Sequence, residues 1–243
     1  MPVTEISEAP FGERFHKLRQ VSDSDWAQTY IGYHAARCAF DVRYLSRNFQ
    51  GSRILNVGGA PYIFEAAASA TDLSVTTVDI DPGRHRGVVE ALGLDVIEGD
   101  FENAAFREGL DLSSYDVICL CEIVEHFRLN LIGLLRSIKA RKRDDTVLYV
   151  TTPNFYFAPR FATFMKQGRS GPPPVEEWRK LEELGHMGHV REYSKIEMEE
   201  LFRFAGFEVA DFFYRNSQPS KGLMGAISRM FDRFAQELVF VLR

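Results

Sequence analysis

Three ionisable side chains at the end of a predicted buried strand have the types and the spacing that proton transfer requires. Glu122, Glu125 and His126 directly follow the apolar run 115–121. On a helical turn, residues three and four positions apart share one face. A histidine in such a place suits a general base because imidazole titrates near neutrality. His126 is therefore the candidate base, with Glu125 beside it.

The same side chains fit two other interpretations. Glu122, Glu125 and His126 can hold a divalent metal, with His189 or His186 as a fourth ligand, and this donor set suits manganese, iron or zinc better than magnesium. Alternatively, Glu125 and His126 only cap and pair at the sheet edge. The assignment adopted here is a catalytic site without a metal, formed by His126, Glu125 and, on the acceptor side, His189.

A second candidate site centres on a glycine turn. The apolar residues of 54–57 predict a buried parallel strand, and Gly58 with Gly59 lets the backbone leave it sharply. Helix-forming residues follow at 63–70, a geometry that directs backbone N–H groups at a ligand. Asp79 ends the next predicted strand about twenty residues later, where a carboxylate can accept from ribose hydroxyls. The combination predicts a nucleoside site.

The turn departs from the dinucleotide fingerprint G-x-G-x-x-G, because Ala60 and Tyr62 stand where glycines are expected. A pyrophosphate needs a closer approach of the backbone than this turn offers, whereas a nucleoside with an amino-acid tail does not. This favours S-adenosylmethionine over NAD. Asp100, at the end of a further strand, can accept from an adenine amino group while Phe101 packs on the ring; alternatively, Asp100 caps the turn that follows.

The elements that must position these residues alternate along the chain. Alternating strands and helices predict a parallel sheet with helices on both faces and ligands at the carboxyl ends of the strands. The last two strands are expected to pair antiparallel. Residues 1–21 are expected to be irregular. The expected strands are 54–57, 75–79, 95–98, 115–121, 146–151, 207–214 and 238–242, and the expected helices are 24–48, 63–70, 86–92, 129–142, 175–184 and 195–205, with an amphipathic helix in 215–236.

Composition limits the possible functions. The 243 residues are 45% hydrophobic, which is enough for one large core. The net charge of −5 gives no overall basic field and no strong nucleic-acid signal. The sequence shows neither a secretory signal nor an apolar run of the roughly 18 residues that span a bilayer, so a cytoplasmic location is expected. Three cysteines, Cys38, Cys119 and Cys121, fit buried thiols in a reducing compartment.

From about Arg53 to Leu242, the order of these motifs resembles the class I S-adenosylmethionine-dependent methyltransferases. The resemblance implies one domain over 1–243 with an α/β, Rossmann-like doubly wound seven-stranded sheet, mostly parallel with a reversed last strand. The chain departs from the family at Asn56, Ala60, Tyr62 and 141–145. The matching segments are 54–59, 78–79, 99–101, 116–126 and 148–154. The implied cofactor contacts are Gly58, Gly59, Ala60, Asp79, Ile80, Asp100, Phe101, Cys121 and Glu122.

Two finer resemblances concern the acceptor. The segments 152–154 and 188–194 resemble bacterial methyltransferases that modify sugars of cell-surface glycans, which implies O-methylation of a sugar hydroxyl. Glu122-x-x-Glu125-His126 with a later histidine is similar to small-RNA 2′-O-methyltransferases, and a small-metabolite acceptor is a further alternative. A nicotinamide-dependent oxidoreductase and a non-catalytic binding module are the rival classes.

Three segments outside the matching motifs are expected to carry acceptor specificity. Residues 1–50 are expected to form a helical cap, and 155–193 a lid or acceptor-binding insert. The amphipathic helix of 215–236 is expected to cover the sheet edge, with docking on a membrane surface or a partner as the alternative.

Overall fold

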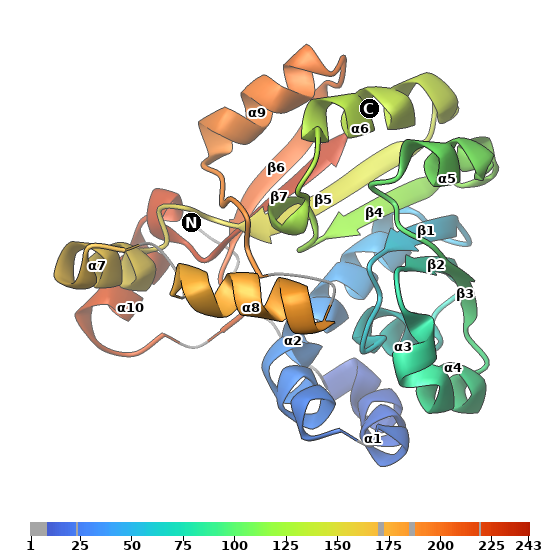
Figure 1. Ribbon diagram of the computed structural model, residues 1–243, viewed down its shortest axis with the longest axis horizontal. Coiled ribbons are helices and arrows are strands. Elements are labelled where there is room, and N and C mark those ends of the chain that lie inside the picture. Colours follow the sequence, from blue (N-terminus) through green and yellow to red (C-terminus); the bar gives the residue numbers. More distant parts are fainter. Residues whose placement is uncertain (1–8, 23, 170–172, 185–187, 219) are drawn as a thin grey trace. The chain divides into compact units, whose positions relative to one another are not determined.

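The computed structural model describes residues 9–22, 24–169, 173–184, 188–218 and 220–243. Within them, seven strands form one sheet in the order β3-β2-β1-β4-β5-β7-β6 (Figure 1). β1 pairs in parallel with β2 and β4, and β2 with β3, whereas β6 and β7 are antiparallel. The predicted seven-stranded, mostly parallel sheet with one reversed strand is confirmed. The strands are β1 (Arg53–Val57), β2 (Ser74–Asp79), β3 (Asp95–Glu98), β4 (Val117–Cys121), β5 (Val147–Pro153), β6 (Val209–Arg215) and β7 (Glu237–Leu242).

The chain divides into two compact units. The N-terminal unit runs to Cys121 and also contains residues 140–149, and the C-terminal unit contains residues 122–139 and 150–242. The glycine turn and Asp79 belong to the N-terminal unit, whereas Glu125, His126 and His189 belong to the C-terminal unit. The two candidate sites are therefore built by different parts of the chain, and each is described within its own unit.

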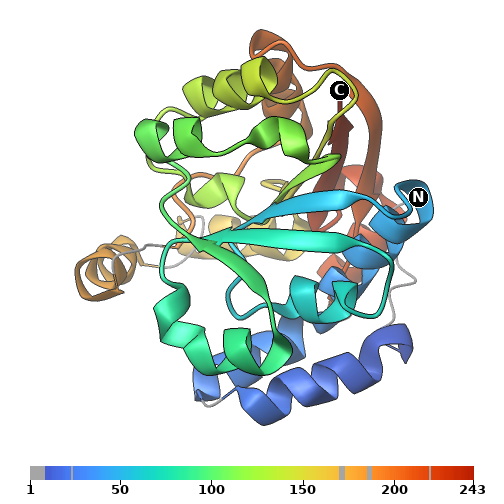
Figure 2. The same ribbon diagram turned by 90° about the vertical axis from the view of Figure 1, so that its right-hand side faces the viewer.

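Helices on both sides of β1 and β2 build the core of the N-terminal unit. α5 lies on the opposite side of these strands from α3 and α4 (Figure 2). All six residues of α3 are buried, which explains why a run of alanines follows the turn, and the one charged residue among them, Glu65, accepts a hydrogen bond from Asn56 of β1. The elements are η1 (Ala9–Phe11), α1 (Gly12–Val21), α2 (Asp25–Asn48), α3 (Ile63–Ala68), η2 (Pro82–His85), α4 (Arg86–Leu92), α5 (Ala104–Gly109) and η3 (Leu112–Ser114).

The prediction that residues 1–21 are irregular is wrong for the described part, which forms η1 and α1. The apolar residues Phe11, Phe15 and Leu18 are spaced four and three apart and are all buried. Two buried residues within one short helix give a weak periodic signal, and the packing of α1 on α2, α3 and α4 supplies the missing stability.

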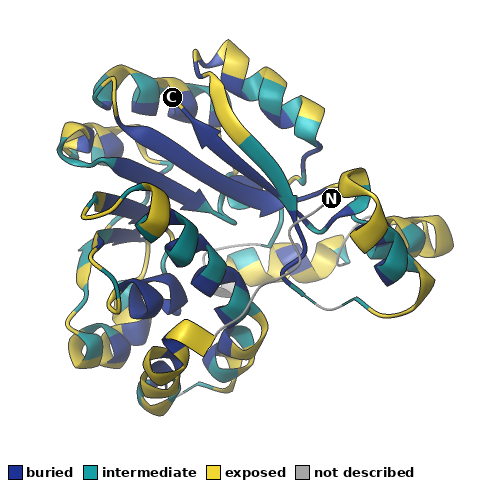
Figure 3. Ribbon diagram, turned by 180° about the vertical axis from the view of Figure 1, so that it is seen from behind, coloured by how far each residue is buried: buried dark blue, intermediate teal, exposed yellow. Residues whose placement is uncertain are grey.

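The C-terminal unit carries the remaining helices. α9 begins with a capping box, in which the side chains of Ser194 and Glu197 each accept a hydrogen bond from the other's backbone N–H. The first three residues of the edge strand β6 are exposed, whereas its neighbour β7 is buried throughout (Figure 3). The elements are η4 (Val124–His126), α6 (Leu131–Arg141), α7 (Ala158–Gln167), α8 (Pro174–Leu184), α9 (Lys195–Phe204), α10 (Gly222–Met230) and η5 (Asp232–Phe234).

Helix α7 lies in the 155–193 insert, at a place where the sequence predicted no helix. It has Pro159 in its first turn and is followed by Gly168, whose φ of 71° is the left-handed conformation typical of the residue that ends a helix. Phenylalanines and a threonine within it reduce helix propensity, so the sequence signal was weak. Among the described residues, no helix is both long and apolar enough to cross a membrane.

Candidate active site

The glycine turn after β1 requires glycine at both of its positions. Gly58 has a φ of 77°, and its N–H donates to Val78 O at 2.8 Å, which ties the turn to β2. A Cβ on Gly59 would lie 2.6 Å from Cγ2 of Thr77 and 2.9 Å from the ring of Tyr62. The first position therefore needs the left-handed backbone and the second needs the absence of a side chain.

The Asp79 carboxylate binds this turn directly. The N–H groups of Gly59 and Ala60 each donate to Oδ2 at 3.0 Å, and the N–H of Asp81 donates to Oδ1 at 3.1 Å. The sequence predicted that amides of this region face a ligand, but the amides of Gly59 and Ala60 are directed at Asp79. A carboxylate accepts about four hydrogen bonds, so Oδ1 keeps capacity for one more donor. A ribose hydroxyl fits this remaining capacity.

A buried polar cluster lies below the turn. The Asn56 amide and the Thr77 hydroxyl donate to Oε1 of Glu65, at 2.8 and 2.6 Å, and all three side chains are buried. Burial raises the pKa of Glu65, against the opposing effect of these two hydrogen bonds. The cluster links β1, β2 and α3, and so fixes the strand ends between which the turn lies.

The other predicted cofactor residues lie at neighbouring strand ends. Ile80, directly after Asp79, is exposed, whereas Phe101 is buried. Oδ1 of Asp100 accepts from the N–H of Glu102 at 2.9 Å, which is the turn-capping role that the sequence left open beside adenine binding. Cys121 ends β4 as a free thiol.

Glu122 does not share a helical face with Glu125 and His126, as the sequence predicted. It has a φ of 53°, and the 3₁₀ turn η4 begins only at Val124. Its carboxylate accepts from the Thr151 hydroxyl at 3.0 Å, and its N–H donates to Thr151 O at 2.9 Å. The left-handed residue turns the chain out of β4, so Glu122 is directed toward β5.

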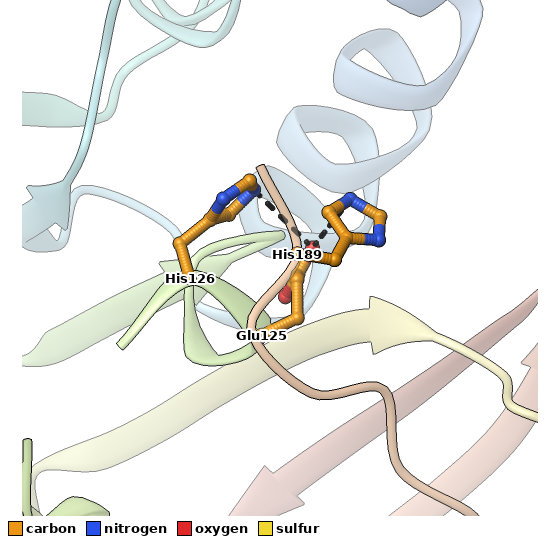
Figure 4. Close-up of side chains that lie close together, drawn as sticks. All are labelled: Glu125, His126 and His189. Carbon is orange, nitrogen blue, oxygen red and sulfur yellow. Dashed lines mark ion pairs between the residues drawn. The ribbon is translucent and has the colours of Figure 1, made fainter. Parts of the chain in front are cut away.

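Glu125, His126 and His189, the three residues of the predicted catalytic site, lie together in one cluster (Figure 4). Oε1 of Glu125 lies 3.9 Å from Nε2 of His126 and 3.9 Å from Nε2 of His189. The two rings are nearly perpendicular, with centroids 5.0 Å apart. Figure 4 shows Glu125 between the two imidazoles, so one carboxylate serves both histidines.

The carboxylate of Glu125 is fully buried, and only one of its two oxygens accepts a hydrogen bond among the described residues. Oε2 accepts from the Thr152 hydroxyl at 3.1 Å, whereas Oε1 has no hydrogen-bond partner among the described residues. The backbone of Glu125 also holds the incoming segment, because its carbonyl accepts from the N–H groups of Val190, at 2.7 Å, and Arg191, at 3.2 Å. A buried carboxylate oxygen without a donor favours a cation or a proton donor nearby.

A fourth residue, Glu192, raises the pKa of His189. Nδ1 of His189 lies 2.6 Å from Oε1 of Glu192, whose other oxygen pairs with Arg160. Burial alone would lower the pKa of His189, but the hydrogen bond to Glu192 and the charges of Glu125 and Glu192 outweigh it and raise that pKa. His189 is thereby stabilised as an imidazolium between two carboxylates.

Glu192 was not identified as a site residue from the sequence. The available signal was a carboxylate three residues after a histidine, in a segment without regular structure. That signal is weak because such pairs are common on protein surfaces. His186, the alternative to His189 in the predicted metal site, lies outside the described residues.

The cluster also fits the donor set of a metal site. One ligand atom from each of Glu125, His126 and His189 lies within 4.8 Å of the others. Glu192 occupies the position of an outer partner, because metal-binding histidines commonly donate their second ring N–H to a carboxylate. Glu122, which the sequence included as a ligand, is not one of these three residues.

The chain was compared with protein-family models, with proteins of curated function and with solved structures. A family model described as a methyltransferase domain matches residues 30–211. No protein of curated function matches the chain in sequence. A solved S-adenosylmethionine-dependent methyltransferase from Archaeoglobus fulgidus has a TM-score of 0.62 and 12% identity, covering 90% of this chain and 99% of that one.

Two further structures share the fold. One is an S-adenosylmethionine-dependent methyltransferase from Mesorhizobium loti, with a TM-score of 0.54 and 15% identity, covering 84% of this chain and 95% of that chain. The other is mitomycin 7-O-methyltransferase MmcR, with a TM-score of 0.52 and 15% identity, covering 96% and 67% respectively. The family match extends over well over half of the chain and includes the glycine turn, Asp79 and η4. The chain therefore belongs to the methyltransferase-domain family and is an S-adenosylmethionine-dependent methyltransferase.

Proposed function

We propose that this methyltransferase transfers the methyl group to a sugar hydroxyl of a cell-surface glycan or its precursor. The observation that carries the proposal is the cluster of Glu125, His126 and His189, in which a buried carboxylate lies 3.9 Å from each of two imidazole nitrogens. A hydroxyl acceptor loses its proton poorly near neutral pH, so its methylation benefits from a base. A cluster of this kind supplies one.

S-adenosylmethionine supplies an electrophilic methyl group, and the protein supplies position and proton transfer. Nε2 of His126 takes the acceptor proton as the oxygen–carbon bond forms and the sulfur–carbon bond breaks. The nearby negative charge of Glu125 stabilises the imidazolium that results. Against the effect of burial, Glu192 and Glu125 raise the pKa of His189, so His189 is assigned as a hydrogen-bond donor to the acceptor and not as the base. The products are S-adenosylhomocysteine, a methyl ether and a proton that His126 returns to solvent.

The turn of the N-terminal unit holds the cofactor in this proposal. Oδ1 of Asp79 accepts from a ribose hydroxyl, and the three backbone N–H groups that already bind Asp79 hold the carboxylate in place. Ala60, Ile80, Asp100, Phe101, Cys121 and Glu122 are proposed as the remaining cofactor contacts, on the resemblance of their segments to the family.

The choice of a sugar acceptor is supported by the segment 188–194. Its sequence resembles methyltransferases of surface glycans, and its residues His189 and Glu192 contribute to the cluster. The same segment thus carries both the acceptor resemblance and the histidine that faces Glu125. Neutral sugars also suit a chain whose net charge is −5, because no basic field is needed to attract them.

Product chemistry tests this proposal. The enzyme is incubated with S-adenosylmethionine carrying a labelled methyl group and with fractionated extracts containing sugar nucleotides, lipid-linked sugars, RNA and small metabolites. We expect label in a sugar fraction as an alkali-stable methyl ether. Label in protein, or attached to nitrogen or carbon, would refute O-methylation of a sugar. A reaction with heat-inactivated enzyme serves as the blank.

A metal-assisted RNA 2′-O-methyltransferase is the second candidate, favoured by the contact between Nδ1 of His189 and Glu192. In that case Glu125, His126 and His189 would hold a divalent cation that activates the hydroxyl. Chelation separates the two candidates. The proposed function predicts that dialysis against EDTA leaves methyl transfer unchanged, whereas the alternative predicts its loss, recovery with Mn²⁺ and label at the 2′-hydroxyl of RNA.

A further inference from the structure

Helix α7 presents apolar side chains to solvent in a regular stripe. Phe161, Phe164 and Met165 lie three and four positions apart and therefore share one face. All three are exposed, and Met165 exposes 69% of its surface. A soluble helix normally turns such a stripe toward the core, so this face is available to an apolar environment.

Helix α10 extends the same surface. α7 and α10 contact each other, and Figure 1 shows them side by side within the C-terminal unit. Leu223 exposes 72% of its surface and Met230 exposes 66%, and Phe231 just beyond the helix is also exposed. We call these six residues the α7–α10 surface: Phe161, Phe164, Met165, Leu223, Met230 and Phe231.

The charged residues of α7 and α10 are basic, and the nearest acidic residue along the chain is the exposed Asp232, directly after Phe231. The stretches 155–169 and 216–231 contain no aspartate or glutamate, although the whole chain has a net charge of −5. Four exposed basic residues lie on or beside the two helices, namely Lys166, Arg169, Lys221 and Arg229. Exposed aromatic and aliphatic side chains next to lysine and arginine are the composition of helices that lie in the headgroup region of a bilayer.

We propose that the α7–α10 surface docks on the headgroups of an anionic lipid bilayer. The apolar side chains enter the boundary between headgroups and acyl chains, while the four basic residues pair with lipid phosphates. Nucleic acid fits the basic residues but not the Leu223, Met165 and Met230 side chains, which offer no hydrogen bonds or stacking faces. A second copy of the chain would bring like charges together. The docking rests on this surface alone and is independent of the proposed acceptor.

Vesicle flotation tests the proposal. The full-length protein is mixed with vesicles of phosphatidylcholine alone, or with one third phosphatidylglycerol, at low and high salt. We expect flotation with the anionic vesicles, at least tenfold less with neutral ones, and a decrease at high salt. Failure of the wild-type protein to float with anionic vesicles at low salt overturns the proposal.

Substitutions at already exposed positions identify the docking surface without disturbing the core. Met165→Ser with Leu223→Ser should reduce flotation at least fivefold, and Lys166→Glu with Arg169→Glu should do the same at low salt. The matched control is Ile196→Ser on α9, where the side chain is 73% exposed but lies outside the α7–α10 surface. Equal flotation of all variants contradicts bilayer docking. Bilayer docking is also contradicted if the protein does not bind vesicles but forms concentration-dependent dimers that these substitutions abolish.

Discussion

The glycine turn and the histidine cluster satisfy their polar groups in opposite ways. In the turn, the Asp79 carboxylate accepts hydrogen bonds from three backbone N–H groups, and the residues that donate them lie within 20 positions of Asp79 in the sequence. In the cluster, the Glu125 carboxylate faces two histidine side chains from segments more than sixty residues apart, and its Oε1 has no hydrogen bond among the described residues. The turn is suited to hold a ligand rigidly, whereas the cluster is suited to change its protonation.

The largest expected effect on turnover is that of Glu125→Gln. This substitution keeps the shape but removes the negative charge that stabilises an imidazolium at His126 and at His189. We expect kcat to fall about 10²–10⁴-fold, the usual scale of general acid–base catalysis, with an unchanged Kd for S-adenosylhomocysteine. Steady-state kinetics and calorimetry measure the two quantities.

The matched control for this charge removal is Glu200→Gln on the exposed face of α9. It should leave both quantities as in the wild type. A weakened Kd in Glu125→Gln with unchanged kcat would mean that the cluster belongs to cofactor binding and would break the comparison.

The complementary substitution is Asp79→Asn. An amide offers one acceptor oxygen in place of two, so at least one of the three backbone N–H groups loses its partner. Hydrogen bonds to a charged group contribute about 1.5–3 kcal/mol, so we expect the Kd for S-adenosylhomocysteine to rise roughly tenfold to a hundredfold. Isothermal calorimetry measures it.

Asp95→Asn is the control for Asp79→Asn. Asp95 is also an aspartate of the N-terminal unit, but it is exposed and accepts from the hydroxyl of Thr76 at 2.6 Å. Its substitution should not alter cofactor affinity. If Asp79→Asn binds as tightly as the wild type, the assignment of the turn to the cofactor is wrong.

The rigidity of the turn is tested by Gly59→Ala. The added Cβ would meet Thr77 and the ring of Tyr62 at 2.6–2.9 Å, so the turn must shift. We expect destabilisation of about 1–3 kcal/mol, as for overpacked cores. Gly87→Ala in α4, where no atom lies within 4 Å of the new Cβ, should instead be neutral or slightly stabilising. Denaturant unfolding compares the two, and equal stabilities would contradict the close packing.

The smallest expected effect concerns the pair of His189 and Glu192. The pKa of His189 is raised from its usual 6.5, so its stabilising contribution is complete below 6.5 and is lost as pH rises through the raised value. Burial would raise the pKa of Glu192, but the hydrogen bond from His189 and the charge of Arg160 outweigh it and lower that pKa from 4.5. The contribution of Glu192 to the stability of the fold is therefore complete above pH 4.5 and is lost as pH falls through the lowered pKa. The pair therefore stabilises most between these two usual values.

Glu192→Gln should accordingly destabilise the fold most between pH 4.5 and 6.5, and less on either side. Urea unfolding at several pH values measures the difference from the wild type. The control is Glu208→Gln, an exposed position, which should show no such window. A constant difference at all pH values would show that the effect of Glu192 is packing rather than charge.

The sequence predicted the sheet and the turn better than it predicted the cluster. Gly58, Gly59 and Asp79 are close to one another because a strand, a turn and the next strand bring them together, and this local order is visible in the sequence. The placement of Glu122 depends on one left-handed residue, and the role of Glu192 depends on how a segment sixty residues away folds back onto η4. Helical periodicity does not contain that information. α7 was missed because its phenylalanines and threonine lower its helix propensity.

The most direct test of the account is methyl transfer by His126→Ala at saturating S-adenosylmethionine with the identified acceptor. We expect kcat to fall at least about a hundredfold and to recover in part as pH rises, because solvent hydroxide replaces the base, while the Kd for S-adenosylhomocysteine stays unchanged. A turnover equal to that of the wild type would show that the cluster of Glu125, His126 and His189 does not activate the acceptor.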